Sequence, residues 1–226
     1  SWALVVGIND YVNWPKLRFA RADAEAVARM LTEKLGFPKD HVFTLYDRDA
    51  NRQAILRILE DRFADSNMVR LEDRVFIYFS GHGDTRQDRG YLMPVDAEQG
   101  KGYSAMAISM QELKDLISPD RIQAKHVYVV TDACYSGMLF VAQKGAGVEK
   151  SHPRYIQEVT RRKARQGLTA GGKEPVSDSG RGGHSVFAAC FLDAVDRGLA
   201  DLNGDGFITA AEISGFLPEK VSNDLT

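Results

Sequence analysis

The sequence has little cysteine, no long hydrophobic run and almost no excess of charge of one sign. Its 226 residues include only Cys134 and Cys190, with no CxxC pair, which argues against a disulfide framework and against a zinc site. No stretch approaches the ~20 apolar residues of a membrane span. A net charge of -2 gives the whole chain no electrostatic preference for nucleic acid or for an anionic membrane. We therefore expect a globular protein of a reducing compartment.

The first residues, SWALVVGIND, lack the basic flank and the small-residue cleavage site of a signal peptide. They begin directly in a strand-like run. We therefore expect a fragment of a longer protein, and we expect a regulatory domain or a partner protein to act on it.

Short apolar runs rich in β-branched and aromatic residues alternate with segments of helical periodicity. Continuous apolarity is typical of strands that are covered on both faces, as in a parallel sheet. The pattern therefore predicts an α/β fold. The expected strands are 2–8, 42–46, 74–80, 126–132 and 168–172, and the expected helices are 20–35, 51–63, 109–117, 184–198 and 210–217.

Two of these strands end in turns that carry reactive side chains. FSGHGD (79–84) contains His82 and TDACYSG (131–137) contains Cys134. Catalytic groups collect at the carboxyl ends of the strands of such sheets. If the two strands are neighbours, His82 and Cys134 meet at one edge.

A thiol attacks as the thiolate, and an adjacent imidazole both lowers the thiol pKa and later protonates the leaving group. Taken alone, Cys134 fits an inert buried thiol and His82 a satisfied turn residue. Together they favour a nucleophile and a general base. The backbone N–H groups of Gly83 and Cys134 are the candidate oxyanion donors, each worth about 3 kcal/mol in a transition state.

FIYFSGHGD, VVTDACYSG, the opening ALVVGINDY and the later GGHSVFAACFLDAV closely resemble the caspase-like cysteine peptidases (clan CD, peptidase C14), in particular the bacterial orthocaspase and metacaspase type. The resemblance covers essentially the whole chain. It implies a caspase-hemoglobinase fold with a mostly parallel six-stranded sheet, Cys134 as the nucleophile and His82 as the general base. It also implies a cytoplasmic protein, although secreted bacterial relatives exist.

The resemblance also implies a pocket for the residue before the cleaved bond. Asp132, Asp23 and Ser80 match the metacaspase-type pocket positions, whereas Ala20 stands where the family often has cysteine. Two carboxylates at the floor of a pocket favour a cation. We therefore expect a protein or peptide substrate that is cleaved after Arg or Lys. The alternatives are an ordinary strand-end acid for Asp132, a helix-dipole acid for Asp23, and an Asp-specific caspase.

Residues 138–167 are rich in Lys, Arg and Gly and predict an exposed basic linker between a large-subunit-like part (1–137) and a small-subunit-like part (168–226) of one domain. A protease specific for basic residues could cut itself there, although charge runs are usually only solvated. The candidate cleavage positions are Lys144, Lys150, Arg154, Arg161, Arg162, Lys163 and Arg165.

DLNGDGFITAAE (201–212) follows the EF-hand calcium pattern. The predicted ligands are Asp201, Asn203, Asp205, the Phe207 carbonyl and Glu212. The alternative is a metal-free polar turn in which Thr209 and Glu212 form a capping box. A non-catalytic interaction or calcium-binding module is the rival to the enzyme, and a phosphate-binding domain is disfavoured because GRGGHS lacks the GxGxxG spacing.

Overall fold

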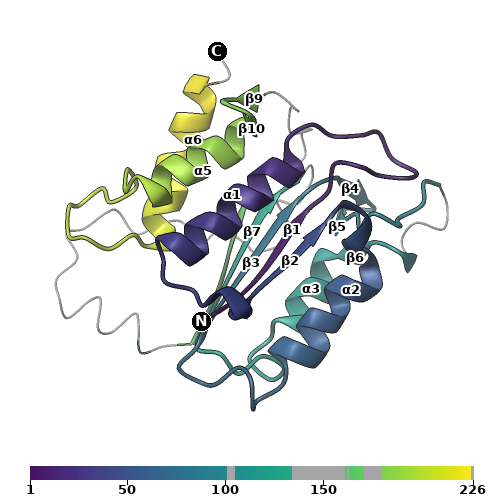
Figure 1. The fold of residues 1–226 in the computed structure, drawn as a ribbon, viewed down its shortest axis with the longest axis horizontal. Coiled ribbons are helices and arrows are strands. Elements are labelled where there is room, and N and C mark those ends of the chain that lie inside the picture. The colour runs from purple at the N-terminus through teal and green to yellow at the C-terminus, as the bar shows by residue number, and fades with distance from the viewer. Residues whose placement is uncertain (101–104, 134–160, 162, 171–179, 225–226) are drawn as a thin grey trace.

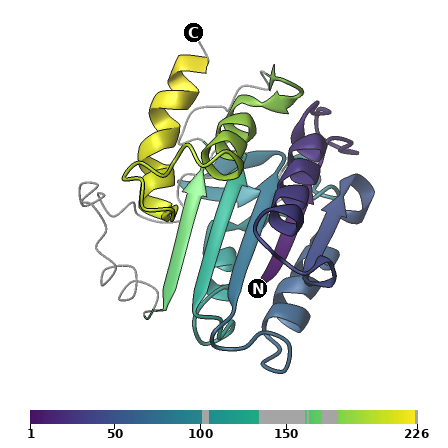
Figure 2. The ribbon, with the colours of Figure 1, turned by 60° about the vertical axis from the view of Figure 1, so that its left-hand side comes forward.

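A parallel sheet with helices on both faces forms the centre of the molecule (Figures 1 and 2). The computed structural model describes residues 1–100, 105–133, 161, 163–170 and 180–224. These residues confirm the predicted α/β class and the mostly parallel sheet. They contribute five strands to it, where the family resemblance implied six.

The five strands of the sheet all run parallel. Their spatial order is β2 (Val42–Tyr46), β1 (Trp2–Gly7), β3 (Arg74–Ser80), β7 (His126–Asp132) and β8 (Ala164–Thr169). The central strands β1, β3 and β7 are buried almost throughout. Successive side chains of a strand point to opposite faces, so each of these apolar runs supplies two cores.

Each face of the sheet is covered by its own set of helices (Figure 1). Helices α1 (Ala20–Glu33), α5 (Val186–Asp196) and α6 (Ala210–Asp224) cover one face. Helix α2 (Arg52–Arg57), which continues as π-helical turns over Ile58–Phe63, covers the other face together with α3 (Met110–Leu116). Short 3-10 turns at Lys39–His41 and Asp47–Asp49 flank β2.

Side-chain caps fix where three helices begin. Asn51 accepts a hydrogen bond from the Ala54 N–H at the start of α2, and Ser109 accepts one from the Glu112 N–H at the start of α3. Ser185 does the same for α5. The helices expected at 51–63 and 109–117 therefore begin at these two caps.

Strand β8 begins earlier than the sequence predicted. The expected strand was 168–172, whereas β8 spans Ala164–Thr169. The Arg165 guanidinium explains the difference, because it donates to the carbonyls of Ile117, Ile122 and Lys125 and so ties the strand to the loop after α3. The last four residues of the predicted basic linker are therefore strand.

Two small antiparallel sheets were not predicted from the sequence. One contains β4 (Gly83–Arg86), β5 (Arg89–Leu92) and β6 (Ile108–Ser109). The other is the hairpin of β9 (Gly180–Arg181) and β10 (His184–Ser185). Strands of two to four residues are too short to show a sequence period. In the described part of the chain, no helix has the length and apolarity to span a membrane.

The chain reverses its direction of travel across the sheet at β1. It passes from β1 to β2 on one side, and β3 then pairs on the other side of β1. Helices α1 and α2 accordingly lie on opposite faces. Ligands of open α/β sheets bind beyond the carboxyl ends of the strands at such a switch point. The loops that follow β1 and β3 therefore lie where folds of this type bind their ligands.

Candidate active site

The carboxyl ends of β1, β3 and β7 lie level with one another. Ser80 is the register partner of both Gly7 and Asp132, and the Gly81 N–H donates to the Asp132 carbonyl at 3.2 Å. The adjacency of the two motif-bearing strands is thus confirmed. His82 follows Ser80 by two residues, and Cys134 follows Asp132 by two. Cys134 itself lies outside the described residues.

The His82 ring lies under the loop that follows β1. Its Nε2 is 2.7 Å from the Pro15 carbonyl oxygen, and its ring centroid is 4.8 Å from that of Tyr11 and 5.5 Å from that of Trp14. A carbonyl oxygen only accepts, so Nε2 carries the proton. In the neutral ring the lone pair then lies on Nδ1, which can take a proton from a thiol.

Tyr11 fixes the backbone of His82. Its buried hydroxyl accepts a hydrogen bond from the His82 N–H at 2.9 Å and donates one to the Met93 carbonyl at 2.8 Å. Burial raises the pKa of Tyr11 well above its usual value, so the hydroxyl keeps its proton. A Cβ on Gly81 would come within 2.5 Å of this oxygen. One hydroxyl thus joins the segments that follow β1, β3 and β5.

Asp47, just after β2, anchors the loop that carries Tyr11. Its carboxylate accepts from the N–H groups of Asn9 and Asp10 and pairs with Arg21 at 3.0 Å. Burial acts to raise the pKa of Asp47, but the backbone donors Asp10 and Asn9 and then Arg21 outweigh it, so the pKa is lowered. The residue also holds a left-handed backbone with φ of 45°. The site geometry therefore depends on a charge two strands away from His82.

The predicted pocket residues lie on the face of the sheet that α1 and α5 cover. Asp23 is 0 % exposed, Asp132 is 6 % exposed and Ser80 is 2 % exposed. Ser185, at the start of α5, joins the two acids. Its N–H lies 3.3 and 3.2 Å from the Asp23 carboxylate oxygens, and its hydroxyl donates to Asp132 at 2.5 Å. The two carboxylates thus converge on one residue.

His184 and Tyr78 interact with the same two acids. The Nδ1 atom of His184 lies 2.7 Å from an Asp23 oxygen. Burial first, and then the negative charges of Asp132 and Asp23, raise the pKa of the Tyr78 hydroxyl well above its usual value. Two buried carboxylates that bond the same residue have the chemistry that favours a cationic partner.

Sequence reasoning missed Pro15, Tyr11, Ser185 and His184. The first two follow β1 in an irregular loop, where no period identifies the side chain that faces the site. Ser185 and His184 were placed inside the predicted helix 184–198, whereas they form β10 and α5 begins only at Val186. Gly83 begins β4 and pairs with Leu92. Its role as an oxyanion donor stays a prediction, as does that of Cys134.

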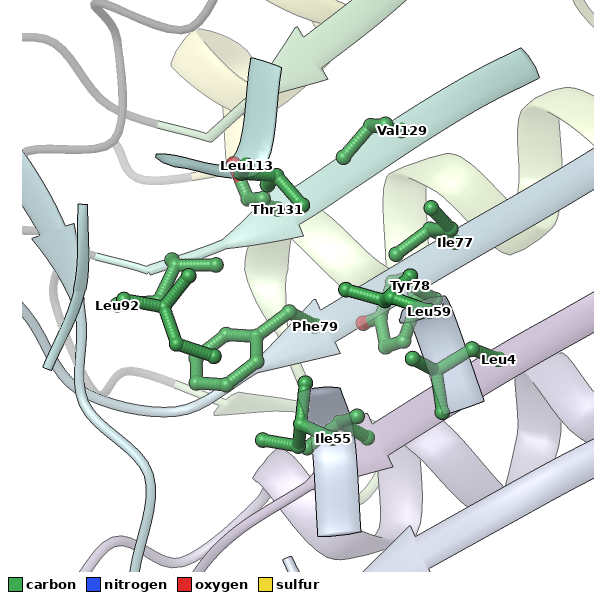
Figure 3. Close-up of a pocket in the computed structure, with 12 residues that line it drawn as sticks. Leu4, Ile55, Leu59, Ile77, Tyr78, Phe79, Leu92, Leu113, Val129 and Thr131 are labelled. Carbon is green, nitrogen blue, oxygen red and sulfur yellow. The ribbon is translucent and has the colours of Figure 1, made fainter. Parts of the chain in front are cut away.

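The interior also contains a small apolar void that is separate from this edge (Figure 3). It measures about 20 Å³ and lies between the sheet and the helices α2 and α3. Leu4, Ile77 and Val129 line it, and Thr131 closes it toward the carboxyl edge. The volume accommodates at most one water molecule. The void is therefore a packing defect of the core and not a substrate site.

The loop 201–212 is folded on itself. Both Asp201 oxygens accept from backbone N–H groups within the loop, and one Glu212 oxygen accepts from the Thr209 N–H and hydroxyl at 2.8 Å. Among the described residues, no three acidic, His or Cys side chains are grouped so that they could hold a metal ion. The other Glu212 oxygen is buried and bonds no described group. The calcium site stays a prediction, and binding requires Glu212 to leave its capping bond.

Cys190 has the properties of an inert thiol. It is buried on α5, with its Sγ 3.4 Å from an Asp224 oxygen. Burial, followed by the Asp224 hydrogen bond and charge, raises the pKa of Cys190 to about 11. A thiol of that pKa is almost wholly protonated at neutral pH. Cys190 is therefore no rival to Cys134 as a nucleophile.

The sequence profile of the caspase domain (Peptidase_C14) matches residues 1–203. The chain belongs to the caspase domain family. Family membership agrees with the parallel sheet and with the histidine motif at its carboxyl edge. The bacterial subtype suggested by the sequence stays a prediction.

Curated relatives from this family include metacaspases of plants and fungi. Metacaspase-3 of Arabidopsis thaliana is 27% identical over 148 residues, covering 60% of this chain and 39% of the relative. Metacaspase-1A of Aspergillus oryzae is 27% identical over 150 residues, covering 60% and 34%. The chain thus spans little more than a third of the length of these relatives. A solved structure, that of the Drosophila initiator caspase Dronc, aligns with a TM-score of 0.43 at 16% identity, covering 57% of this chain and 46% of that one.

Proposed function

We propose that this chain is a cysteine endopeptidase that hydrolyses peptide bonds after Arg or Lys, with Cys134 as the nucleophile and His82 as the general base. The observation that carries the proposal is the register of β3 and β7. Ser80 lies opposite Asp132, so the histidine and cysteine motifs leave the sheet at the same level. Membership of the caspase domain family supports the same reaction.

The proposed reaction follows from the way His82 is held. With Nε2 donating to the Pro15 carbonyl, the ring takes the thiol proton of Cys134 at Nδ1. The thiolate attacks the peptide carbonyl, the N–H groups of Gly83 and Cys134 stabilise the oxyanion, and the imidazolium protonates the departing amine. Water then hydrolyses the thioester, with His82 accepting a proton from the water and returning it to the sulfur.

The preference for Arg or Lys rests on Asp23 and Asp132. Both carboxylates are buried and both bond Ser185, which sits at the N-terminus of α5. The Ser185 N–H and hydroxyl donate to the two acids at the N-terminus of α5, where the helix dipole favours negative charge. A guanidinium or ammonium group that enters the proposed pocket would pair with these two carboxylates.

Self-processing is part of the proposal, but with fewer candidate cleavage positions than the sequence suggested. Arg165 lies in β8 with its guanidinium bonded to carbonyls, so it no longer belongs among the exposed cleavage positions. Arg161 is exposed, as is Lys163. The other candidate residues of the linker lie outside the described residues. Calcium binding at 201–212 is proposed as a separate regulatory input.

The test uses matched fluorogenic peptides that end in Arg, Lys or Asp, with calcium and with chelator. We expect cleavage after Arg and Lys that falls by more than about a thousandfold in Cys134→Ala. Cys190→Ala is the matched control, because that thiol is buried away from the sheet edge, and it should retain activity. Mass spectrometry of the incubated chain should find new N-termini at or before Ala164, from cleavage up to Lys163, and none at Gln166, which cleavage after Arg165 would produce.

Two other outcomes contradict the proposal. Cleavage only after Asp would make the chain an Asp-specific caspase. Silence on every peptide, with and without calcium, would favour the non-catalytic interaction module.

A further inference from the structure

His184 contacts one of the two pocket acids directly. Its Nδ1 is 2.7 Å from the Asp23 carboxylate, and its side chain is 25% exposed while that of Asp23 is 0% exposed. A carboxylate only accepts, so the neutral ring must carry its proton on Nδ1. Neutral His184 therefore donates to Asp23 without cancelling its charge.

The hairpin that holds His184 is packed against the start of α1. A Cβ on Gly180 would come within 2.2 Å of the Phe19 ring, so only glycine lets β9 approach this closely. His184 pairs with Arg181 across the hairpin, and the next residue, Ser185, binds both acids. The strand pairing with Arg181 and the bonds of Ser185 thus fix the backbone that places the imidazole beside Asp23.

The charged and titratable groups around His184 come from every element packed there. Arg181 on β9 binds Asp193 of α5 and Asp224 of α6. Burial first, and then the charge of Arg29 on α1, lower the pKa of His184. Among the described residues, the other groups are Asp23 on α1 and, behind it, Asp132 on β7 and Tyr78 on β3. The ring is therefore neutral at pH 7 and gains its proton only on acidification.

We propose that His184 is a specificity-determining residue that positions Asp23 and, on gaining a proton, cancels the Asp23 charge, so that preference for a basic substrate is lost at acidic pH. The inference rests on the proposed function. A protonated ring places a positive charge 2.7 Å from the Asp23 carboxylate and so weakens the attraction of this acid for a cationic substrate. Linkage makes the effect reciprocal, because a cation in the pocket disfavours protonation of His184.

The first measurement compares kcat/KM for paired peptides that end in arginine or in its neutral isostere citrulline. The ratio cancels the titration of Cys134 and His82, which affects both substrates alike. We expect the ratio to fall about tenfold between pH 7.5 and pH 5. His184→Asn supplies a neutral N–H at the position of Nδ1 and should keep the ratio independent of pH. His41→Asn is the control, since His41 bonds the neutral Ser1 carbonyl and stacks on Trp2, and the ratio for this variant should change with pH as it does for the parent.

A second measurement needs no turnover. In the full chain carrying Cys134→Ala, the guanidinium compound agmatine is titrated while the His184 ring is followed by NMR. We expect agmatine to bind about tenfold more weakly at pH 5 than at pH 7.5, and to lower the His184 pKa when bound. Agmatine binding that is independent of pH, or an arginine-to-citrulline ratio that does not change, overturns the role of His184 alone. Absence of both arginine cleavage and agmatine binding overturns the basic-specific pocket together with this inference.

Discussion

Two polar regions of this caspase-family chain are built in opposite ways. At the carboxyl edge of the sheet, Tyr11 bonds His82 and Met93, and Ser185 bonds Asp23 and Asp132, so every contact joins residues far apart in the sequence. In the loop 201–212, the Asp201 carboxylate bonds N–H groups no more than five residues away. The edge is assembled by the fold, whereas the loop assembles itself.

The difference lies in how the acids of each region are bonded. Asp23 and Asp132 are buried, and both bond Ser185 from a third element. The Asp201 carboxylate accepts hydrogen bonds from the local backbone of its own loop. In the proposed pocket a cation would meet acids that long-range contacts hold in place, whereas in the loop it would have to displace local bonds. Three experiments test this contrast.

Removing the Tyr11 hydroxyl should have the largest effect. Tyr11→Phe leaves the His82 N–H and the Met93 carbonyl without their partner, and a misplaced base mainly affects turnover. We expect kcat to fall about 10- to 100-fold with KM little changed. Tyr128→Phe is the matched control, because that buried hydroxyl bonds no group in the described part of the chain. Equal kcat values for the two variants would contradict the positioning role of Tyr11.

Neutralising Asp47 should have an intermediate effect that depends on pH. Its lowered pKa means that the ionised acid stabilises the fold above its unfolded pKa of about 3.9, and that this contribution is lost as pH falls through the lower folded value. Asp47→Asn should lower the free energy of unfolding by about 1–3 kcal/mol at pH 7. Urea unfolding from pH 7 to pH 3 should show the two proteins converging below pH ~4. Asp49→Asn changes an exposed neighbour and should leave the free energy of unfolding unchanged. If the difference in free energy of unfolding between Asp47→Asn and the parent stayed the same at pH 3, the charge of Asp47 would be excluded as its cause.

The loop should show the smallest effect. Isothermal titration of the full chain should give a calcium dissociation constant of roughly 10⁻⁴–10⁻³ M, because metal must displace local bonds. Glu212→Gln should weaken binding more than about tenfold while leaving stability in chelator nearly unchanged. Glu219→Gln, an exposed acid on the same helix, should bind as the parent does. No binding at millimolar calcium would identify the loop as a capped turn only.

Much of the scaffold could be predicted because its signals are local. The continuous apolar runs placed β1, β3 and β7, and helical periodicity placed the starts of α2 and α3 to within a residue. Strand β8 was placed too late, since the carbonyls that hold Arg165 lie 40 or more residues away. The hairpin of β9 and β10 was missed for a different reason. Its two-residue strands carry no period of their own.

The sequence by itself determined the candidate chemistry. A histidine and a cysteine each follow an apolar strand, and Asp132 lies two residues before the cysteine. Only the tertiary structure decided which groups orient and bond these residues. The Pro15 carbonyl orients His82, and Ser185 joins Asp23 to Asp132. Hydrogen bonds across more than 50 residues of chain depend on strand order and register, which arise from burying both faces of the sheet at once.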